Sequence, residues 1–100
     1  MTRTRRTSLQ DSADRLRVLR EALGLTQVQI SRVCGIGQQA WNNYEGARRR
    51  ISVDQALRLR NSIGVTLDWI YAGDPKGLPW ELWMKIRTTE NLQRHKKELA

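Results

Sequence analysis

The sequence predicts an all-α protein, in which five short helices form one domain and a C-terminal helical extension follows it. Apolar residues recur at helical spacing, as Leu16, Leu19 and Leu23 do near the N-terminus. Serine or threonine precedes several of these segments and glycine follows them, as expected of helix caps. No segment shows the period-two alternation that is typical of a strand. Residues 9–73 are therefore expected to form a compact helical domain.

The first two predicted helices follow each other closely. The first spans about residues 12–23 and ends at Gly24. Thr26 begins the second, and Gln29 stands three residues later, where it completes a capping box. Its buried side is expected to consist of Ile30, Val33 and Cys34.

Three more helices complete the predicted domain. The third spans residues 37–46, between two glycines. Ser52 caps the fourth, with Gln55 in the capping-box position, and Thr66 begins a short fifth helix, "LDWIYAG". The apolar side of the fourth helix is expected to consist of Ala56, Leu57, Leu59 and Ile63.

Composition narrows the class of function. A formal charge of +8 on 100 residues favours an acidic partner, meaning nucleic acid, an anionic membrane or an acidic protein. No apolar run approaches the roughly 20 residues of a spanning helix, so no membrane partner is expected. Cys34 is the only cysteine and His95 the only histidine, which is too few for a zinc finger. A single cysteine cannot form an intramolecular disulfide and suits a reducing cytoplasm. Scattered carboxylates and the lack of a glycine-rich phosphate loop argue against an enzyme, and no cofactor is implied.

The stretch "GIGQQAWNNYEG" carries four neutral amides on the third predicted helix. At 3.6 residues per turn they fall within about 140° of arc, with Trp41 and Tyr44 on the opposite side. Amides both donate and accept hydrogen bonds, and Asn or Gln can pair with the major-groove edge of adenine. The predicted base-reading residues are Gln38, Gln39, Asn42 and Asn43. When this helix is considered alone, the alternative interpretation is a polar face that contacts only water.

Neighbouring features favour the DNA interpretation. The turn "CGIG" is too short to let the second and third helices run antiparallel. The two helices must cross steeply, and such a crossing is typical of a helix-turn-helix. Arg48, Arg49 and Arg50 follow the third helix, where they would meet phosphates beside the groove. Gln27, in the first turn of the second helix, is a further predicted phosphate contact.

Residues 12–73 resemble the phage repressor and Cro-like helix-turn-helix domains, also called the xenobiotic-response-element class. The resemblance rests on Gln27, Gly35, "GIGQQ", "YEG" and the segment leading to "LDWIYAG", in that order and spacing. It implies a five-helix lambda-repressor-like fold and base contacts from Gln38, Gln39 and Asn43. It also implies that Gln27 touches a phosphate and braces Gln38.

Two residues depart from the pattern of that family. Ser31 stands where alanine is usual, so its hydroxyl needs a partner, for which a carbonyl one turn back is a candidate. Trp41 replaces a smaller aliphatic residue, and its bulk could tilt the third helix. Glu45, within "YEG", is expected to serve a structural purpose such as pairing with an arginine. Most arginines of the first and fourth helices are expected to be solvated, and they are Arg15, Arg17, Arg20, Arg58 and Arg60.

The two ends of the chain have open interpretations. Residues 1–8 form a basic arm, and Arg3, Arg5 and Arg6 either contact DNA or are merely solvated. Residues 74–100 form a Trp-rich extension whose apolar set is Leu78, Trp80, Trp83 and Met84. This face either folds back over the core of the domain, joins two copies of the chain, or binds another protein.

The sequence thus predicts a sequence-specific double-stranded-DNA-binding transcriptional regulator, acting as a repressor and a homodimer. Helix 37–46 would enter the major groove, and two copies would bind half-sites about one helical turn apart. Two alternatives stay open. One is an antitoxin or excision-control protein of a mobile element. The other is an antiactivator that binds a second protein through the Trp-rich extension.

Overall fold

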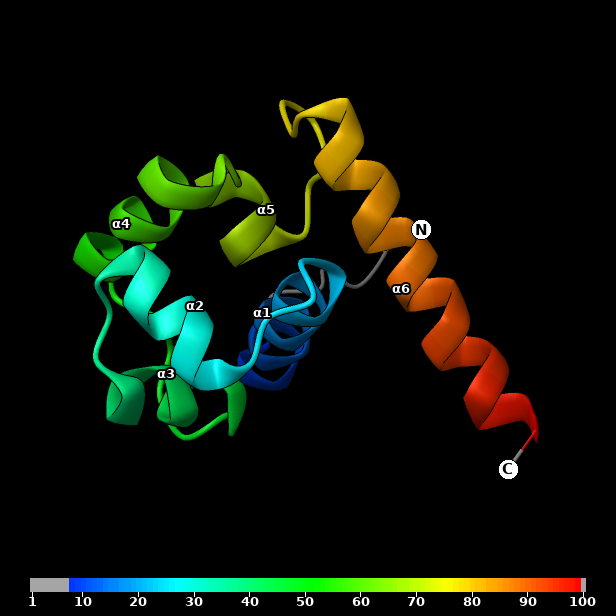
Figure 1. Cartoon of the computed structure of the whole chain (residues 1–100), viewed down its shortest axis with the longest axis horizontal. Coiled ribbons are helices and arrows are strands. Elements are labelled where there is room, and N and C mark those ends of the chain that lie inside the picture. The colour runs from blue at the N-terminus through cyan, green and yellow to red at the C-terminus, as the bar shows by residue number, and fades with distance from the viewer. Residues whose placement is uncertain (1–7, 100) are drawn as a thin grey trace.

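Helices account for most of residues 8–99, the part of the chain that this computed structural model describes (Figure 1). In chain order they are α1 (Leu9–Ala22), α2 (Gln27–Cys34), α3 (Gln38–Glu45), α4 (Val53–Ile63), α5 (Leu67–Ala72) and α6 (Trp80–Leu99). No strand occurs within that range. The predicted all-α fold of five helices and a C-terminal helical extension is confirmed.

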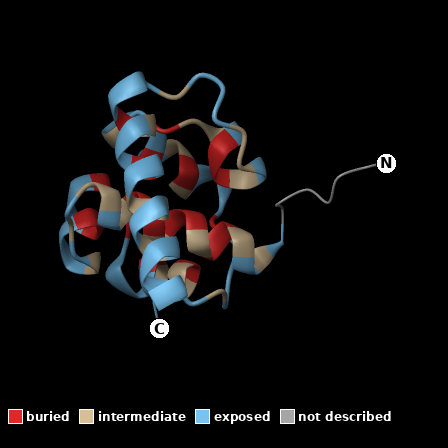
Figure 2. Cartoon of the chain, turned by 90° about the vertical axis from the view of Figure 1, so that its right-hand side faces the viewer, coloured by how far each residue is buried: buried red, intermediate tan, exposed pale blue. Residues whose placement is uncertain are grey.

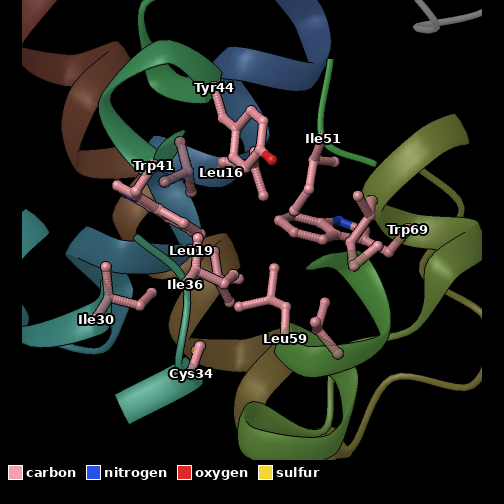
Figure 3. Packing of buried hydrophobic residues seen from close by; sticks show 14 of the residues in the cluster. Leu16, Leu19, Ile30, Cys34, Ile36, Trp41, Tyr44, Ile51, Leu59 and Trp69 are labelled. Atoms are coloured by element: carbon pink, nitrogen blue, oxygen red, sulfur yellow. The ribbon is translucent and has the colours of Figure 1, made fainter. Parts of the chain in front are cut away.

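Helix α1 lies at the centre of the packing, in contact with α3, α5 and α6, while α2 packs on α3 and α4. Side chains from α1 to α5 converge on a single apolar core, which includes Leu19, Trp41 and Leu59 (Figure 3). All three are completely buried. Burying a tryptophan in the middle of the core fixes α3 firmly against α1.

The helix starts follow the predicted caps. The Thr26 Oγ1 accepts from the Gln29 backbone N–H at 3.1 Å, and the Gln29 Oε1 accepts from the Thr26 N–H at 2.9 Å, which confirms the capping box. Ser52 Oγ accepts from the Gln55 N–H at 3.2 Å. The reciprocal half of that second box is absent, because the Gln55 Oε1 is buried with no hydrogen-bond partner among the residues described.

Two details of α1 and α2 differ from expectation. Helix α1 begins at Leu9 rather than near residue 12, because the Ser8 Oγ accepts from the Asp11 N–H at 3.0 Å and caps it. Val33 was expected to be buried, but 53% of it is exposed. The buried stripe of α2 runs through Ile30, Ser31 and Cys34, and Val33 is rotated about 60° beyond its edge.

The expectation of solvated arginines is wrong for Arg15. Only 4% of this residue is exposed, and its Nε donates to the carbonyl oxygen of Ile70 at 3.1 Å. Arg58 also has a partner, because its Nη1 donates to the Gly35 carbonyl oxygen at 2.8 Å. Arg15 therefore ties α1 to α5, and Arg58 ties α4 to the end of α2.

Helix α6 packs against α1 and contributes to the core (Figures 1 and 2). Leu82 and Ile86 are its buried residues, with 7% and 0% exposed. Trp80 is 72% exposed and Met84 44%, so these two residues of the Trp-rich face do not fold back over the core. The reason is helical geometry, because Leu82 and Ile86 lie roughly opposite Trp80 and Met84 around the helix axis.

The other two residues of the Trp-rich set are half-buried. Leu78 and Trp83 pack against the edge of the core. The Arg87 guanidinium lies 5.5 Å from the centroid of a Trp83 ring, within the range of a cation–π contact. None of the helices in the described range is long and apolar enough to cross a membrane.

Candidate functional site

The turn between α2 and α3 consists of three residues, Gly35 to Gly37. Gly35 has φ 68°, a left-handed conformation that glycine adopts without strain. Ile36 is 3% exposed, and its N–H donates to the Ser31 carbonyl oxygen at 3.0 Å. The turn is therefore anchored in the core, and it redirects the chain so that α3 packs directly on α2.

Helix α3 has the two faces that the sequence predicts. Trp41 and Tyr44 are buried, whereas Gln38, Gln39 and Asn42 are exposed and Asn43 is half-buried. Neither Gln38 nor Gln39 hydrogen-bonds through its side chain to another residue in the described range. Both amides are therefore available, in an outward-facing row at the N-terminal end of α3.

The side chain of Glu45 joins three helices at the other end of α3. Its two oxygens accept from the Arg20 Nε and Nη2 at 2.7 and 3.1 Å. They also accept from the Gln27 Nε2 at 3.2 Å and from the Trp41 indole N–H. Only 5% of the Glu45 side chain is exposed, and its hydrogen bond with Arg20 raises the pKa of that guanidinium.

This cluster explains both Glu45 and Trp41. The expected pairing of Glu45 with an arginine is confirmed, and Trp41 is accommodated in the core with its only polar atom satisfied. Arg20 lies 25 residues before Glu45, so no helical spacing could have revealed the pair. The motif "YEG" gave the only signal, through the single acidic residue on α3.

The side chains of Gln27, Asn42, Arg48 and Asn43 continue from this cluster across the surface. The Asn42 Nδ2 donates to the Gln27 Oε1 at 3.1 Å, and Asn42 Oδ1 accepts from the Arg48 Nη2. Arg48 Nε donates to the Asn43 Oδ1 at 3.1 Å. Gln27 therefore contacts Asn42 and Glu45 rather than Gln38, which is the residue it was expected to brace.

The loop that follows α3 presents the three predicted phosphate contacts. Arg48, Arg49 and Arg50 are all exposed. Arg48 lies against α3, whereas Arg49 and Arg50 make no side-chain hydrogen bond within the described range. Ile51, buried in the core, ends the loop, and its carbonyl oxygen accepts from the Tyr71 hydroxyl at 2.8 Å. Burial of Tyr71 raises its pKa, an effect that nearby Arg50 partly opposes.

The remaining candidate residues lie apart from this surface. Arg3, Arg5 and Arg6 fall outside the described residues. The Trp-rich set belongs to α6 and the connector before it, on the other side of α1 from α2 and α3 (Figure 1). Within residues 8–99, no group of three or more His, Cys, Asp and Glu side chains could hold a metal ion.

The surface thus consists of a recognition-type helix with outward amides, fixed on the core, and a basic loop beside it. A family model described as a helix-turn-helix domain matches residues 13–68. The matched range includes α2, α3, the arginine loop and α4. No curated protein and no solved structure matches the chain significantly.

Proposed function

We propose that this chain, which belongs to the helix-turn-helix domain family, is a sequence-specific regulator of transcription. It binds double-stranded DNA by inserting α3 into the major groove. The observation that carries the proposal is the pair of exposed, unengaged amides of Gln38 and Gln39 beside the loop of Arg48, Arg49 and Arg50. The amides supply the chemistry for reading base edges, and the guanidinium groups supply the attraction to phosphates.

The proposed contacts with DNA are of two kinds, those with bases and those with phosphates. Gln38, Gln39 and Asn43 read bases, at about 1–3 kcal/mol of discrimination for each good bidentate pair. Arg49 and Arg50 meet the phosphates that flank the groove. Gln27 was also expected to contact a phosphate, but both ends of its amide are engaged by Glu45 and Asn42, so its share of phosphate contact is smaller. Asn42 was also expected to read bases, but both ends of its amide are engaged within the protein. It supports its neighbours, and its share of base reading is smaller.

The regulator acts as a homodimer and a repressor. A short recognition helix reads only a few base pairs, so two copies on half-sites about one helical turn apart give the affinity that one copy lacks. Binding near a promoter then blocks or positions RNA polymerase. The formal charge of +8 assists association with DNA of any sequence.

Selection of bound duplexes from a random-sequence pool, at near-physiological salt, tests this function. The expected product is a two-fold motif with half-sites about one turn apart. Sedimentation of the protein with the recovered duplex then gives the number of chains bound. Recovery of no motif, with only salt-sensitive binding to all duplexes, would exclude sequence-specific regulation.

Two variants separate base contacts from phosphate contacts. Gln39→Ala is expected to relax the preference at particular base pairs of the motif. Arg49→Ala is expected to weaken binding to all duplexes alike and to reduce the slope of the salt dependence by roughly one. Identical behaviour of the two variants would contradict the division.

A second candidate function is the binding of another protein through α6. Trp80 and Met84 favour it, because two large apolar side chains are exposed on adjacent turns of one helix. The double substitution Trp80→Ala, Met84→Ala would then abolish regulation in cells and leave affinity for the selected duplex unchanged. Loss of duplex affinity would instead assign these residues to the DNA-binding dimer.

A further inference from the structure

The polar side chains between Glu45 and Arg48 form a hydrogen-bonded chain with only one self-consistent direction. A carboxylate can only accept, and a guanidinium can only donate. Gln27 must therefore turn its NH2 group toward Glu45, which leaves its oxygen for Asn42. Asn42 in turn directs its NH2 group to Gln27 and its oxygen to Arg48. The Glu45 carboxylate and the Arg48 guanidinium, at the two ends of this series of hydrogen bonds, thus fix the orientation of each amide between them.

Arg48 imposes the same orientation on Asn43. Its Nε donates to the Asn43 Oδ1 at 3.1 Å while its Nη2 holds the Asn42 oxygen. One planar guanidinium thereby engages the oxygens of two successive amides, an arrangement that suits its rigid fork of donors. With its oxygen directed to the loop, Asn43 has its NH2 group left for another partner.

Gly46 provides the space in which the guanidinium lies. A Cβ atom at this position would stand 2.8 Å from the Arg48 Nη1, 2.9 Å from its Cζ and 3.0 Å from its Nη2. The backbone of Gly46, with φ −84° and ψ 4°, is one that any residue can adopt. The glycine therefore leaves room for the Arg48 guanidinium in this position and is not required by the course of the backbone.

We propose that Arg48, seated over Gly46, is a specificity-determining residue that orients the amide of Asn43 as a hydrogen-bond donor toward DNA. A bidentate pair with adenine needs the amide oxygen to accept from N6 while the NH2 group donates to N7. An oxygen held by Arg48 is turned away from that role. A base that offers acceptors, such as guanine with O6 and N7 or thymine with O4, is then preferred opposite Asn43.

This inference rests on the proposed function, and one selection experiment separates the two. The duplex selection is carried out on the wild-type chain and on the variants Asn43→Ala, Gly46→Ala, Arg48→Met and Arg49→Met. Asn43→Ala identifies the base pair that Asn43 reads, as the position whose preference relaxes. Gly46→Ala retains every charge but displaces the guanidinium from the amides. Arg49→Met removes a neighbouring charge and is the matched control for Arg48→Met.

At the position identified by Asn43→Ala, we expect wild-type protein to select guanine or thymine. Gly46→Ala and Arg48→Met should both shift that preference toward adenine by on the order of tenfold. Gly46→Ala should keep the salt dependence of the wild type, because no charge is lost. Arg49→Met should weaken binding to all sequences and leave the preferred base unchanged.

Other outcomes overturn the inference in distinguishable ways. If Gly46→Ala and Arg48→Met keep the wild-type base preference, Arg48 contacts only the DNA phosphates and does not affect which base is selected. The proposed function then stands. Arg48 likewise loses its role in specificity if Asn43→Ala relaxes no position. If the wild type itself selects no motif, the proposed function fails as well. Thermal unfolding of each variant checks that it folds, and the exposed position of Arg48 keeps Arg48→Met informative.

Discussion

Glu45 is a buried carboxylate whose neighbours supply hydrogen-bond donors from all three of the helices α1, α2 and α3. We expect Glu45→Gln to lower the free energy of unfolding by about 3 kcal/mol, because the amide turns a donor toward the Arg20 guanidinium and leaves that charge unpaired. Urea unfolding measures the loss. Asp14→Asn is the matched control, since its pair with Arg17 at 3.2 Å has side chains 33% and 40% exposed. The control should change stability by less than about 1 kcal/mol, and equal effects would mean that burial adds nothing to the Glu45 cluster.

Ser31 is a buried residue of α2 whose hydroxyl we expect to lower the stability of the fold. It is 5% exposed, and its Oγ has no hydrogen-bond partner in the described part of the chain, so the expected carbonyl partner is absent. Ser31→Ala should raise the free energy of unfolding by about 1 kcal/mol, because it removes an unsatisfied polar group and adds no volume. Ser52→Ala removes a helix cap and should lower stability by about 1 kcal/mol. A loss of stability in Ser31→Ala would indicate a partner such as a bound water.

Cys34 is a buried thiol, and burial raises its pKa, partly offset by a hydrogen bond with Ser62. Because the folded pKa exceeds the unfolded one, the thiol stabilises the fold fully below its ordinary pKa. That contribution is lost as pH rises through the raised value. We expect iodoacetamide to label native protein at pH 8 on the order of tenfold more slowly than protein in urea. Equal labelling rates would favour a redox-sensing thiol over a structural one.

At the scale of the element, local signals predicted the helices well. The capping box of Thr26 and Gln29 and the two faces of α3 depend on residues within about one turn, so the sequence contains them. The pair of Arg20 and Glu45 and the contact of Arg15 with Ile70 depend on how helices meet, and they span 25 and 55 residues. No periodicity encodes such contacts. The arginines of α1 could therefore be assigned only from the packed structure.

The same limit applies to the surface that we propose reads bases. Its row of amides follows from helical spacing, but the engagement of Asn42 by Gln27 and Arg48 requires α2, α3 and the loop to be placed together. The sequence indicated which residues face outward. It could not indicate which of them are already hydrogen-bonded to each other.

The loop after α3 contains a backbone conformation that its residue disfavours. Ala47 has φ 58°, in the left-handed region where a Cβ is crowded by the backbone. Ala47→Gly should raise the free energy of unfolding by up to about 1 kcal/mol, because glycine adopts this conformation without strain. Thermal unfolding measures the change. Ala72→Gly, within α5, is the control and should lower stability by a similar amount. A destabilised Ala47→Gly would show that the loop is held by its side chain.

At the scale of the whole molecule, α6 and the helix-turn-helix occupy opposite sides of α1 (Figure 1). The core requires only one face of α6, that of Leu82 and Ile86. The opposite face, with Trp80 and Met84, is open to solvent in the single chain (Figure 2). Helix α6 can therefore stabilise the domain and bind a partner at the same time, without occupying the surface assigned to DNA.

Two substitutions on α6 separate these roles. Ile86→Ala should lower the free energy of unfolding by about 3 kcal/mol, because it leaves a cavity between α6 and α1. Trp80→Ala should change it by less than about 0.5 kcal/mol at low protein concentration, because the side chain is 72% exposed. If Trp80 joins two copies, the melting temperature of the wild type rises with concentration and that of Trp80→Ala does not. Small losses from Ile86→Ala, with a large one from Trp80→Ala at every concentration, would mean that α6 packs through its other face.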